Sequence, residues 1–524
     1  MWSIPWRSAS SAAKKEGVTS LSEETFQAMM DFSPIFATLV GVPGWDDRLE
    51  DISVDGQQSL RARLTDVLAR VEESDEDAVA RDVIRHQATS IITRIDARLV
   101  EHTVSRGLNA PVAGLLRSAS QVDFSQRRHL VPHFLDQAGQ RLLNTDRRPL
   151  RRHVQGGAAY VERFLASPRQ EWEGDADLRP AFARYREVLL GLPGRDDEQA
   201  GLCWLPDGEE NYRKLVRDYT TASYTPAELH QLGLDLIAGL REEYAEIGSR
   251  VWGTGDVPEI FRRLRTDLLW ANEDDMLVDA VKTVARAEAE APNWFGRQPL
   301  ARCEVRFVPE IDRQNAAFAY YEDAALDGSR PGVYFVNPLN ATGRSRTVSE
   351  VTAFHEAIPG HHFQLSIAAE TELSNLRKFA FIDSYIEGWG LYTERLADEM
   401  GLYSSDEARL GMLGLDAMRA GRLVVDTGIH ALGWSRQQAV DYLSENTVMD
   451  HTEISSEVDR YIETPGQALA YMVGRLEIQR VRAEAEEKMG SRFDVKAFHD
   501  LVLENGVLPL STLADLVTDW AGRP

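Results

Sequence analysis

The segment Phe354-His355-Glu356-Ala357-Ile358-Pro359-Gly360-His361-His362-Phe363-Gln364 is the most informative stretch of this 524-residue chain. Imidazole nitrogens are common zinc ligands, and a glutamate beside them can act as a general base. Histidines at positions i and i+4 of a helix share one face. Position i+4 from His355 is Pro359, which has no ligand atom and disturbs a helix. We therefore expect the second ligand to be either His361 or His362.

This segment resembles the HExxH motif of zinc peptidases, in which two histidines bind the metal and the glutamate activates water. The match is imperfect because Pro359-Gly360 is inserted. A break at this insertion is expected to bring one of His361 and His362 beside His355, and the residues leave open which one. The other histidine is expected to line the substrate cleft or to hydrogen-bond a carboxylate such as Glu394. The alternative interpretation is a polar helix that happens to carry three histidines.

A third, anionic ligand is expected from the segment Tyr385-Ile386-Glu387-Gly388-Trp389-Gly390-Leu391-Tyr392-Thr393-Glu394. Glu387 follows the histidines at a distance that accommodates one helix, a turn and entry into a second helix. Its apolar neighbours indicate an acid drawn toward a core, where a metal compensates its charge. The sequence thus predicts zinc bound by His355, Glu387 and one of the two later histidines, which leaves a fourth position for water. The alternative is an ordinary solvated glutamate.

Two segments farther along the chain contain candidates for contacting the substrate. They are 451–461, which runs from His451 to Arg460 and Tyr461, and 465–471, which ends at Tyr471. Peptide hydrolysis passes through an oxyanion, which a neutral histidine or a tyrosine hydroxyl can stabilise. His451 and Tyr461 are candidates for this role, although such residues are more often structural.

The segments HEAIPGHHFQ, EGWGLYTE and PGQALAYMVGRLEI together resemble the bacterial domain-of-unknown-function family 885, which has an HExxPGHH signature. The specific motifs lie within about residues 207–477. That family is similar to the helical gluzincin peptidases, which include angiotensin-converting enzyme and thimet oligopeptidase.

The resemblance implies that His355 and Glu387 are zinc ligands and that Glu356 is the general base. It implies that His451 and Tyr461, with Arg460 just before the tyrosine, contact the substrate carbonyl, and that Arg460 and Tyr471 bind substrate. It also implies a large helical, zincin-like fold with a cleft, in which the strand before the His355 helix offers an exposed edge to an extended peptide.

Helical signals dominate the chain from about residue 20. The S/T-x-x-E/Q capping box is matched by Ser20 with Glu23, Thr225 with Glu228 and Ser435 with Gln438. Apolar residues recur at helical spacing over 82–100, 229–240, 278–291 and 469–481. Asp426 and His430, at i and i+4 of another predicted helix, are expected to hydrogen-bond each other. Trp389, Tyr392 and Trp434 are expected in the core.

Three β-rich runs, 303–309, 316–321 and 332–337, predict one small antiparallel sheet with a turn over 327–332. No repeat or low-complexity linker divides the chain. We therefore expect a flexible tail over 1–17, then one large, mainly α-helical domain over 18–524, arranged as two lobes around a cleft.

The composition excludes several classes of partner. The net charge of −25 repels nucleic acid and anionic membranes. Two cysteines, Cys203 and Cys303, do not make a disulfide framework. The sequence has no signal-peptide pattern and no apolar stretch of about 18 residues, so a cytoplasmic location is expected.

These features predict a zinc-dependent peptidase with a peptide substrate. One alternative is a non-catalytic peptide-binding protein on a degenerate peptidase scaffold. Retention of Glu356 argues against it, because a binding module does not need a general base. The other alternative is a metal-dependent hydrolase that acts on a non-peptide amide or ester, and no residue distinguishes it.

Overall fold

The computed structural model describes residues 19–105, 109–118, 122–166, 177–310, 313, 316–324 and 330–523. Residues 1–17, where a flexible tail is predicted, lie outside these ranges, as do residues 327–329 of the predicted turn. Within them the chain is mainly α-helical with one small sheet, as predicted. None of the helices in these ranges combines the length and the apolar composition needed to cross a bilayer.

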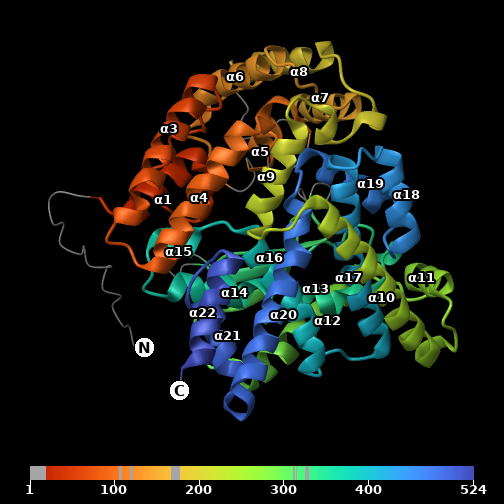
Figure 1. Ribbon diagram of the computed structural model, residues 1–524. Coiled ribbons are helices and arrows are strands. Elements are labelled where there is room, and N and C mark those ends of the chain that lie inside the picture. The colour runs from red at the N-terminus through yellow and green to blue at the C-terminus, as the bar shows by residue number, and fades with distance from the viewer. Residues whose placement is uncertain are drawn as a thin grey trace, which may run out of the picture.

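The N-terminal helices form the upper part of the molecule in Figure 1. They are α1 (Leu21–Phe32), α2 (Pro34–Leu39), α3 (Val54–Arg70), α4 (Ala78–Asp96), α5 (Pro111–Ser118), α6 (Val131–Leu143), α7 (Arg151–Ala166) and α8 (Leu178–Gly191). Helices α5 to α8 surround a hydrophobic core of their own, which includes Phe134 and Phe182. Helices α1, α3 and α4 instead contribute Phe26, Leu64 and Ile84 to the main core.

The central part of the chain places four helices before the sheet. They are α9 (Gly208–Thr220), α10 (Pro226–Trp252), α11 (Val257–Thr266) and α12 (Glu273–Glu290). The strands follow as β1 (Cys303–Phe307), β2 (Ala319–Glu322) and β3 (Gly332–Val336).

The remaining helices carry the predicted functional residues. They are α13 (Ser349–Glu356), α14 (His361–Glu370), α15 (Asn375–Phe379), α16 (Asp383–Glu399), α17 (Asp406–His430), α18 (Arg436–Asn446), α19 (His451–Glu463), α20 (Ala470–Met489), α21 (Val495–Glu504) and α22 (Leu510–Gly522). Helix α16 lies near the centre of the molecule in Figure 1, with the N-terminal helices above it. The main core contains residues from both ends of the described chain, from Leu21 to Ala521.

Local capping chemistry fixes where several of these helices begin. Thr225 and Ser435 each form the predicted capping box, with reciprocal bonds between the cap and the third helical residue. Ser20 accepts a hydrogen bond from the backbone N–H of Glu23 at the start of α1. These bonds satisfy backbone donors that a helix cannot pair internally.

The sheet has the predicted strands but not the predicted pairing. The strand order is β1-β3-β2; β2 pairs antiparallel with β3, whereas β1 pairs parallel with β3, so the sheet is mixed and not antiparallel. The prediction that the strand before the His355 helix is an exposed edge is therefore wrong, because β3 is the central strand. All five of its residues, Gly-Val-Tyr-Phe-Val, are buried, as expected for a strand covered on both faces.

Candidate metal centre

The predicted interruption of the histidine helix is a complete break. Helix α13 ends at Glu356 and α14 begins at His361, and the Ile358–Pro359 peptide bond is cis. A side-chain carbon at Gly360 would overlap the carbonyl oxygen of His355, so only glycine fits where the chain turns back. The indole nitrogen of Trp389 on α16 donates a 3.0 Å hydrogen bond to the carbonyl of Pro359, which satisfies a backbone acceptor that the break leaves free.

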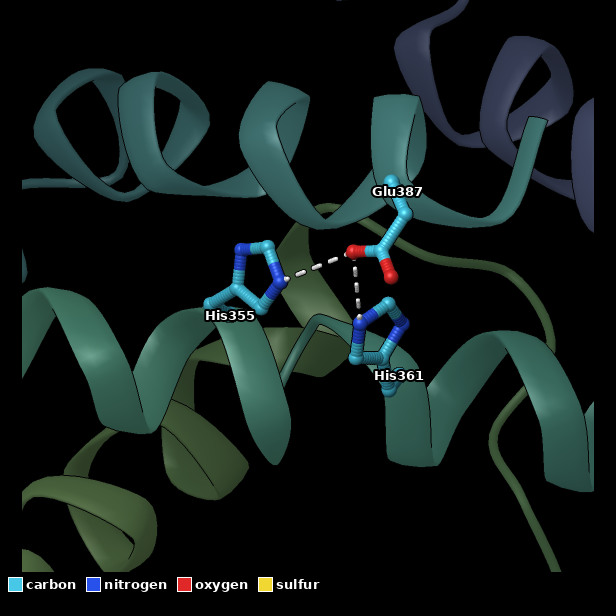
Figure 2. A group of neighbouring side chains, drawn as sticks. All are labelled: His355, His361 and Glu387. Carbon is cyan, nitrogen blue, oxygen red and sulfur yellow. Dashed lines mark ion pairs between the residues drawn. The ribbon is translucent and has the colours of Figure 1, made fainter. Parts of the chain in front are cut away.

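This break brings His355 and His361 together against Glu387 of α16. Figure 2 shows the two imidazoles approaching the carboxylate from the ends of two successive helices. The Nε2 atoms of His355 and His361 each lie 3.5 Å from the same oxygen, Glu387 Oε2. One potential ligand atom from each residue lies within 4.8 Å of the others. Two imidazole nitrogens and one carboxylate oxygen form a donor set typical of catalytic zinc sites.

Glu394 orients His355 through the ring nitrogen that does not face Glu387. It lies two helical turns after Glu387 on α16, is fully buried, and its Oε1 lies 2.8 Å from His355 Nδ1. A hydrogen bond at Nδ1 fixes the imidazole so that Nε2 faces Glu387. Glu394 was expected to hydrogen-bond whichever of His361 and His362 is not a metal ligand. That expectation is wrong, because Glu394 bonds His355.

The charges of the cluster reinforce one another. Burial acts to lower the pKa of His355, but Glu387 and Glu394 outweigh it and raise the pKa to about 10. Burial acts in the opposite direction on the carboxyl of Glu387, and contacts with His355 and His361 hold its pKa well below its usual range. A carboxylate that stays ionised is available as a charged ligand.

His362 points away from the cluster. Its Nδ1 lies 2.9 Å from the hydroxyl of Tyr321 on β2 and 3.4 Å from Ser366 Oγ. Burial lowers the pKa of His362 to about 4, so the ring is neutral at pH 7. His361 therefore belongs to the cluster and His362 connects α14 to the sheet.

Glu356 is the last residue of α13 and follows His355 directly. It is partly exposed, unlike the buried His355. No described residue forms a hydrogen bond with its carboxylate.

The predicted residues of α19 occupy different environments. His451 is the exposed first residue of this helix, and no hydrogen bond or ion pair among the described residues joins it to the cluster. Tyr461 is fully buried, donates a 2.7 Å hydrogen bond to Glu457 and accepts one of 2.9 Å from Arg422. Arg460 bonds Glu457 and Gln467. Glu457, Arg460 and Tyr461 thus form a polar network along α19.

Tyr471, a predicted substrate residue, lies in the first turn of α20. Burial, and then the carboxylate of Glu387, raise the pKa of Tyr471 to about 12. Two arginines of α17 that were not predicted from the sequence approach this tyrosine: the guanidinium carbon of Arg422 lies 4.5 Å from the ring centre and that of Arg419 lies 6.0 Å from it. Their sequence signal is two arginines three positions apart within the otherwise apolar stretch 417–425 of this helix.

Asp426 and His430 do not form the hydrogen bond predicted between them. Asp426 accepts from the hydroxyl of Tyr212 and from the backbone N–H of Gly466. His430 contacts the backbone of Leu202 and Tyr461. Both side chains join α17 to other elements because the tertiary contacts outweigh a bond along one helix.

Trp389 and Tyr392 are buried as predicted, and Trp434 packs against a core as a partly buried residue.

Two cavities lie away from the cluster, among the N-terminal helices. One measures about 400 Å³ and is lined by residues that include Glu50, Arg63 and Arg94. The other measures about 560 Å³ and is lined by residues that include Arg98 and Arg141. The cleft expected beside the histidines remains a prediction.

Comparisons with known proteins relate the chain to uncharacterised bacterial proteins. A family model described as "Bacterial protein of unknown function (DUF885)" matches residues 34–517. A solved protein of Colwellia psychrerythraea, described provisionally as a lipoprotein, is similar with a TM-score of 0.85 and 24% identity, over 96% of this chain and 100% of that one. One of Shewanella oneidensis, described provisionally as a lipoprotein of unknown function, has a TM-score of 0.72 and 19% identity, over 95% and 99%. No curated protein matches. The two structures show the fold alone.

Proposed function

The chain belongs to the DUF885 family of bacterial proteins, and we propose that it is a zinc-dependent peptidase. The observation that carries this proposal is the convergence of His355, His361 and Glu387, with Glu356 at the end of the same helix as His355. The cluster supplies three ligand atoms of the types that catalytic zinc sites use, and a fourth position is left for water or substrate.

The donor set fits a divalent metal for a second reason. Glu394 holds His355 by Nδ1 at 2.8 Å, which leaves Nε2 as the ligand nitrogen. In zinc sites, the ring nitrogen of a histidine ligand that does not bind the metal commonly donates a hydrogen bond to a carboxylate. When bound, zinc polarises a carbonyl and increases the acidity of water.

Glu356 is proposed as the general base. Its carboxylate follows the ligand His355 in the chain, is partly exposed and is not engaged by a described hydrogen-bond partner. It can accept a proton from the attacking water and deliver that proton to the leaving amine. This role requires a carboxylate and not an amide, because an amide cannot take up the proton.

The oxyanion role of His451 and Tyr461 remains a prediction. The hydroxyl of Tyr461 already donates to Glu457, so it acts on a substrate only if that bond is exchanged. Tyr471 is a further candidate because Arg419, which lies 6.0 Å from the centre of its ring, also lies 3.8 Å from Glu394, the partner of His355. A phenol near the metal ligands can donate a hydrogen bond to a developing oxyanion.

The test combines metal analysis with two substitutions. Protein purified without chelator is expected to hold about one zinc ion per chain. Glu356→Gln should retain the zinc and lose activity toward a peptide library by at least about 100-fold, whereas Glu387→Gln should lose zinc. Glu399→Gln is the matched control, since Glu399 is an exposed residue at the end of the same helix as Glu387.

Three outcomes are informative. Absence of divalent metal even after zinc is supplied contradicts the proposal. Zinc binding with peptide affinity but no hydrolysis favours the non-catalytic binding protein. Hydrolysis of esters or non-peptide amides, but of no peptide in the library, favours the alternative hydrolase.

A further inference from the structure

Two buried arginines next to the candidate metal centre have donor groups that no acceptor uses. Arg419 and Arg422 lie on α17, three positions apart, and both approach the ring of Tyr471 on α20. Arg419 is 8% exposed and Arg422 is 5% exposed. Among the described residues, Nε and Nη1 of Arg419 and Nη1 of Arg422 have no hydrogen-bond partner.

Such donors are costly to bury. A guanidinium group has five N–H donors and no acceptor. A buried donor that lacks a partner destabilises the folded protein, and a charged donor does so more strongly. The other nitrogens of Arg422 are well paired: Nε donates to Tyr461 and Nη2 to Glu457. The free donor of Arg422 thus lies on a side chain that two other hydrogen bonds hold in place.

Near Tyr471 the positively charged side chains outnumber the carboxylates that pair with them. Arg419, Arg422 and Arg460 share the two carboxylates of Glu394 and Glu457, with nitrogen–oxygen distances of 3.8, 2.8 and 3.0 Å. The contact of Arg419 with Glu394 is long, and it is made to Oε1, the oxygen that also faces His355. One positive charge in this group is therefore not compensated by these two carboxylates.

Two further acids near Arg419 do not supply the missing charge. Asp416 is held by its own ion pairs, which are made with Arg395 and Arg475. Glu453 is exposed and lies near another cation, Arg344. Both acids therefore have other cations close to them, and the free donors of Arg419 and Arg422 still lack an acceptor.

We propose that Arg419 and Arg422 bind a carboxylate group of the substrate. The site lies close to the candidate metal centre, because Nη2 of Arg419 lies 3.8 Å from Oε1 of Glu394, the carboxylate that holds His355. This inference rests on the proposed peptidase function and names its substrate class: peptides that carry a carboxylate within a residue or two of the cleaved bond. The carboxylate is either the peptide C-terminus or an acidic side chain.

Binding is measured separately from turnover. Isothermal titration calorimetry on zinc-loaded Glu356→Gln protein compares three probes: the tripeptide Ala-Ala-Ala, its C-terminal amide, and the C-terminal amide of Ala-Ala-Glu. Ala-Ala-Ala is expected to bind at least about tenfold more tightly than its amide, as charge-assisted hydrogen bonds require. Tight binding of the Ala-Ala-Glu amide would identify an acidic side chain as the source of the carboxylate.

Substitutions locate the site. Arg419→Gln and Arg422→Gln should each reduce the preference for the acid over the amide to about threefold or less. Arg409→Gln, on the same helix but paired with Asp398 and Asp406, should leave that preference unchanged. Circular dichroism checks that each variant is folded, and the comparison on the parent protein needs no arginine variant.

The outcomes separate this inference from the proposed function. Equal affinity for Ala-Ala-Ala and both amides overturns the carboxylate site, even if the wild-type protein hydrolyses peptides. A preference for the acid that survives both arginine substitutions overturns it as well. A preference that depends on the arginines supports the site even if the wild-type protein cleaves no peptide, in which case only the peptidase proposal fails.

Discussion

His355 shows how a single side chain is oriented from both sides. Its Nδ1 faces Glu394 and its Nε2 faces Glu387, and both acids come from one face of α16. The ring cannot rotate without losing one of these contacts. The imidazole is thus preorganised before any ligand binds, which reduces the free energy needed to assemble the site.

The adjacent histidines are predicted to have different functions. His361 Nε2 lies 3.5 Å from Glu387, whereas His362 contacts Tyr321. His361→Ala should lower the zinc content of dialysed protein to well below one ion per chain, because only two ligands remain. His362→Ala should retain the zinc and lose some thermal stability, since it removes a buried contact with the sheet.

Elemental analysis and thermal denaturation check this prediction, and each variant is the control for the other. Equal zinc loss in both variants would indicate a general folding defect. Equal retention would exclude His361 as a ligand. The sequence left the choice open because it depends on how the chain turns back at Gly360, and spacing along the chain does not determine that turn.

Asp426 is predicted to make stability depend on pH. Burial raises its pKa to about 7 from 3.8, against the hydrogen bonds from Tyr212 and Gly466. Between these values the folded chain retains a proton that the unfolded chain has released. The stabilising contribution is therefore full below about pH 4 and is lost as the pH rises toward 7, by about 1.4 kcal/mol per pH unit.

Asp426→Asn removes this titration and keeps the acceptor oxygen that receives both hydrogen bonds. The unfolding free energy of the variant, relative to that of the wild type, should therefore increase between pH 4 and pH 7. Denaturant unfolding at several pH values measures the slope, and any constant cost of the amide cancels. Asp441→Asn, at an exposed position, is the control variant. A difference independent of pH would contradict the prediction.

At the scale of elements, the centre depends on how α16 packs against the break between α13 and α14. Trp389 and Thr393 donate hydrogen bonds to the carbonyls of Pro359 and Phe354. The motif residues on both segments, and the break at Pro359-Gly360, were predictable from the sequence. Arg419 and Arg422 were not, because residues of a third helix enter the site only through tertiary packing.

Gly390 is predicted to be required for the position of His355. A side-chain carbon at Gly390 would lie 2.5 Å from Cε1 of the His355 ring, which is too close for van der Waals contact. Gly390→Ala should displace the imidazole, weaken zinc binding about 10–100-fold as other disturbances of ligand orientation do, and destabilise the protein.

The control is Gly239→Ala on α10, where a side-chain carbon meets no atom within 4 Å. Alanine is a better helix former than glycine, so this variant should be as stable as the wild type or more stable, by about 0.5–1 kcal/mol. A competition titration with a zinc chelator, together with thermal unfolding, compares the two variants. Unchanged zinc affinity in Gly390→Ala would show that the ring tolerates displacement.

The sheet illustrates what a one-dimensional pattern can predict. The three strands were identified from β-forming residues, but the order β1-β3-β2 was not. Pairing partners are chosen by long-range contacts that local propensity does not encode. One signal was present: Gly-Val-Tyr-Phe-Val in β3 is apolar without alternation, which is typical of a central strand and not of an exposed edge.

At the scale of the whole molecule, α19 connects the two groups of helices. Its last residue, Glu463, accepts hydrogen bonds from the backbone N–H groups of Val104 and Ser105 and from the Ser105 hydroxyl. One turn earlier, Asp459 contacts His153 of α7. The helix with the predicted substrate residues is thereby attached to helices that have a separate hydrophobic core.

The prediction of one large domain leads to an expected unfolding behaviour. Because residues near both ends of the described chain share the main core, the wild-type protein should unfold in one calorimetric transition. Glu463→Gln removes a buried charge that receives three donors from the N-terminal segment. We expect it to cost about 1–3 kcal/mol and to lower the unfolding temperature by a few degrees.

Differential scanning calorimetry is the measurement, and Glu484→Gln is the control. Glu484 lies on α20, and among the described residues its exposed carboxylate pairs only with Arg480, so its loss should change stability by less than about 0.5 kcal/mol. If Glu463 is the main connection of the α5–α8 core to α19, its substitution should also separate a minor, earlier transition from the main one. Two transitions in the wild type would instead show that the two cores unfold as independent domains.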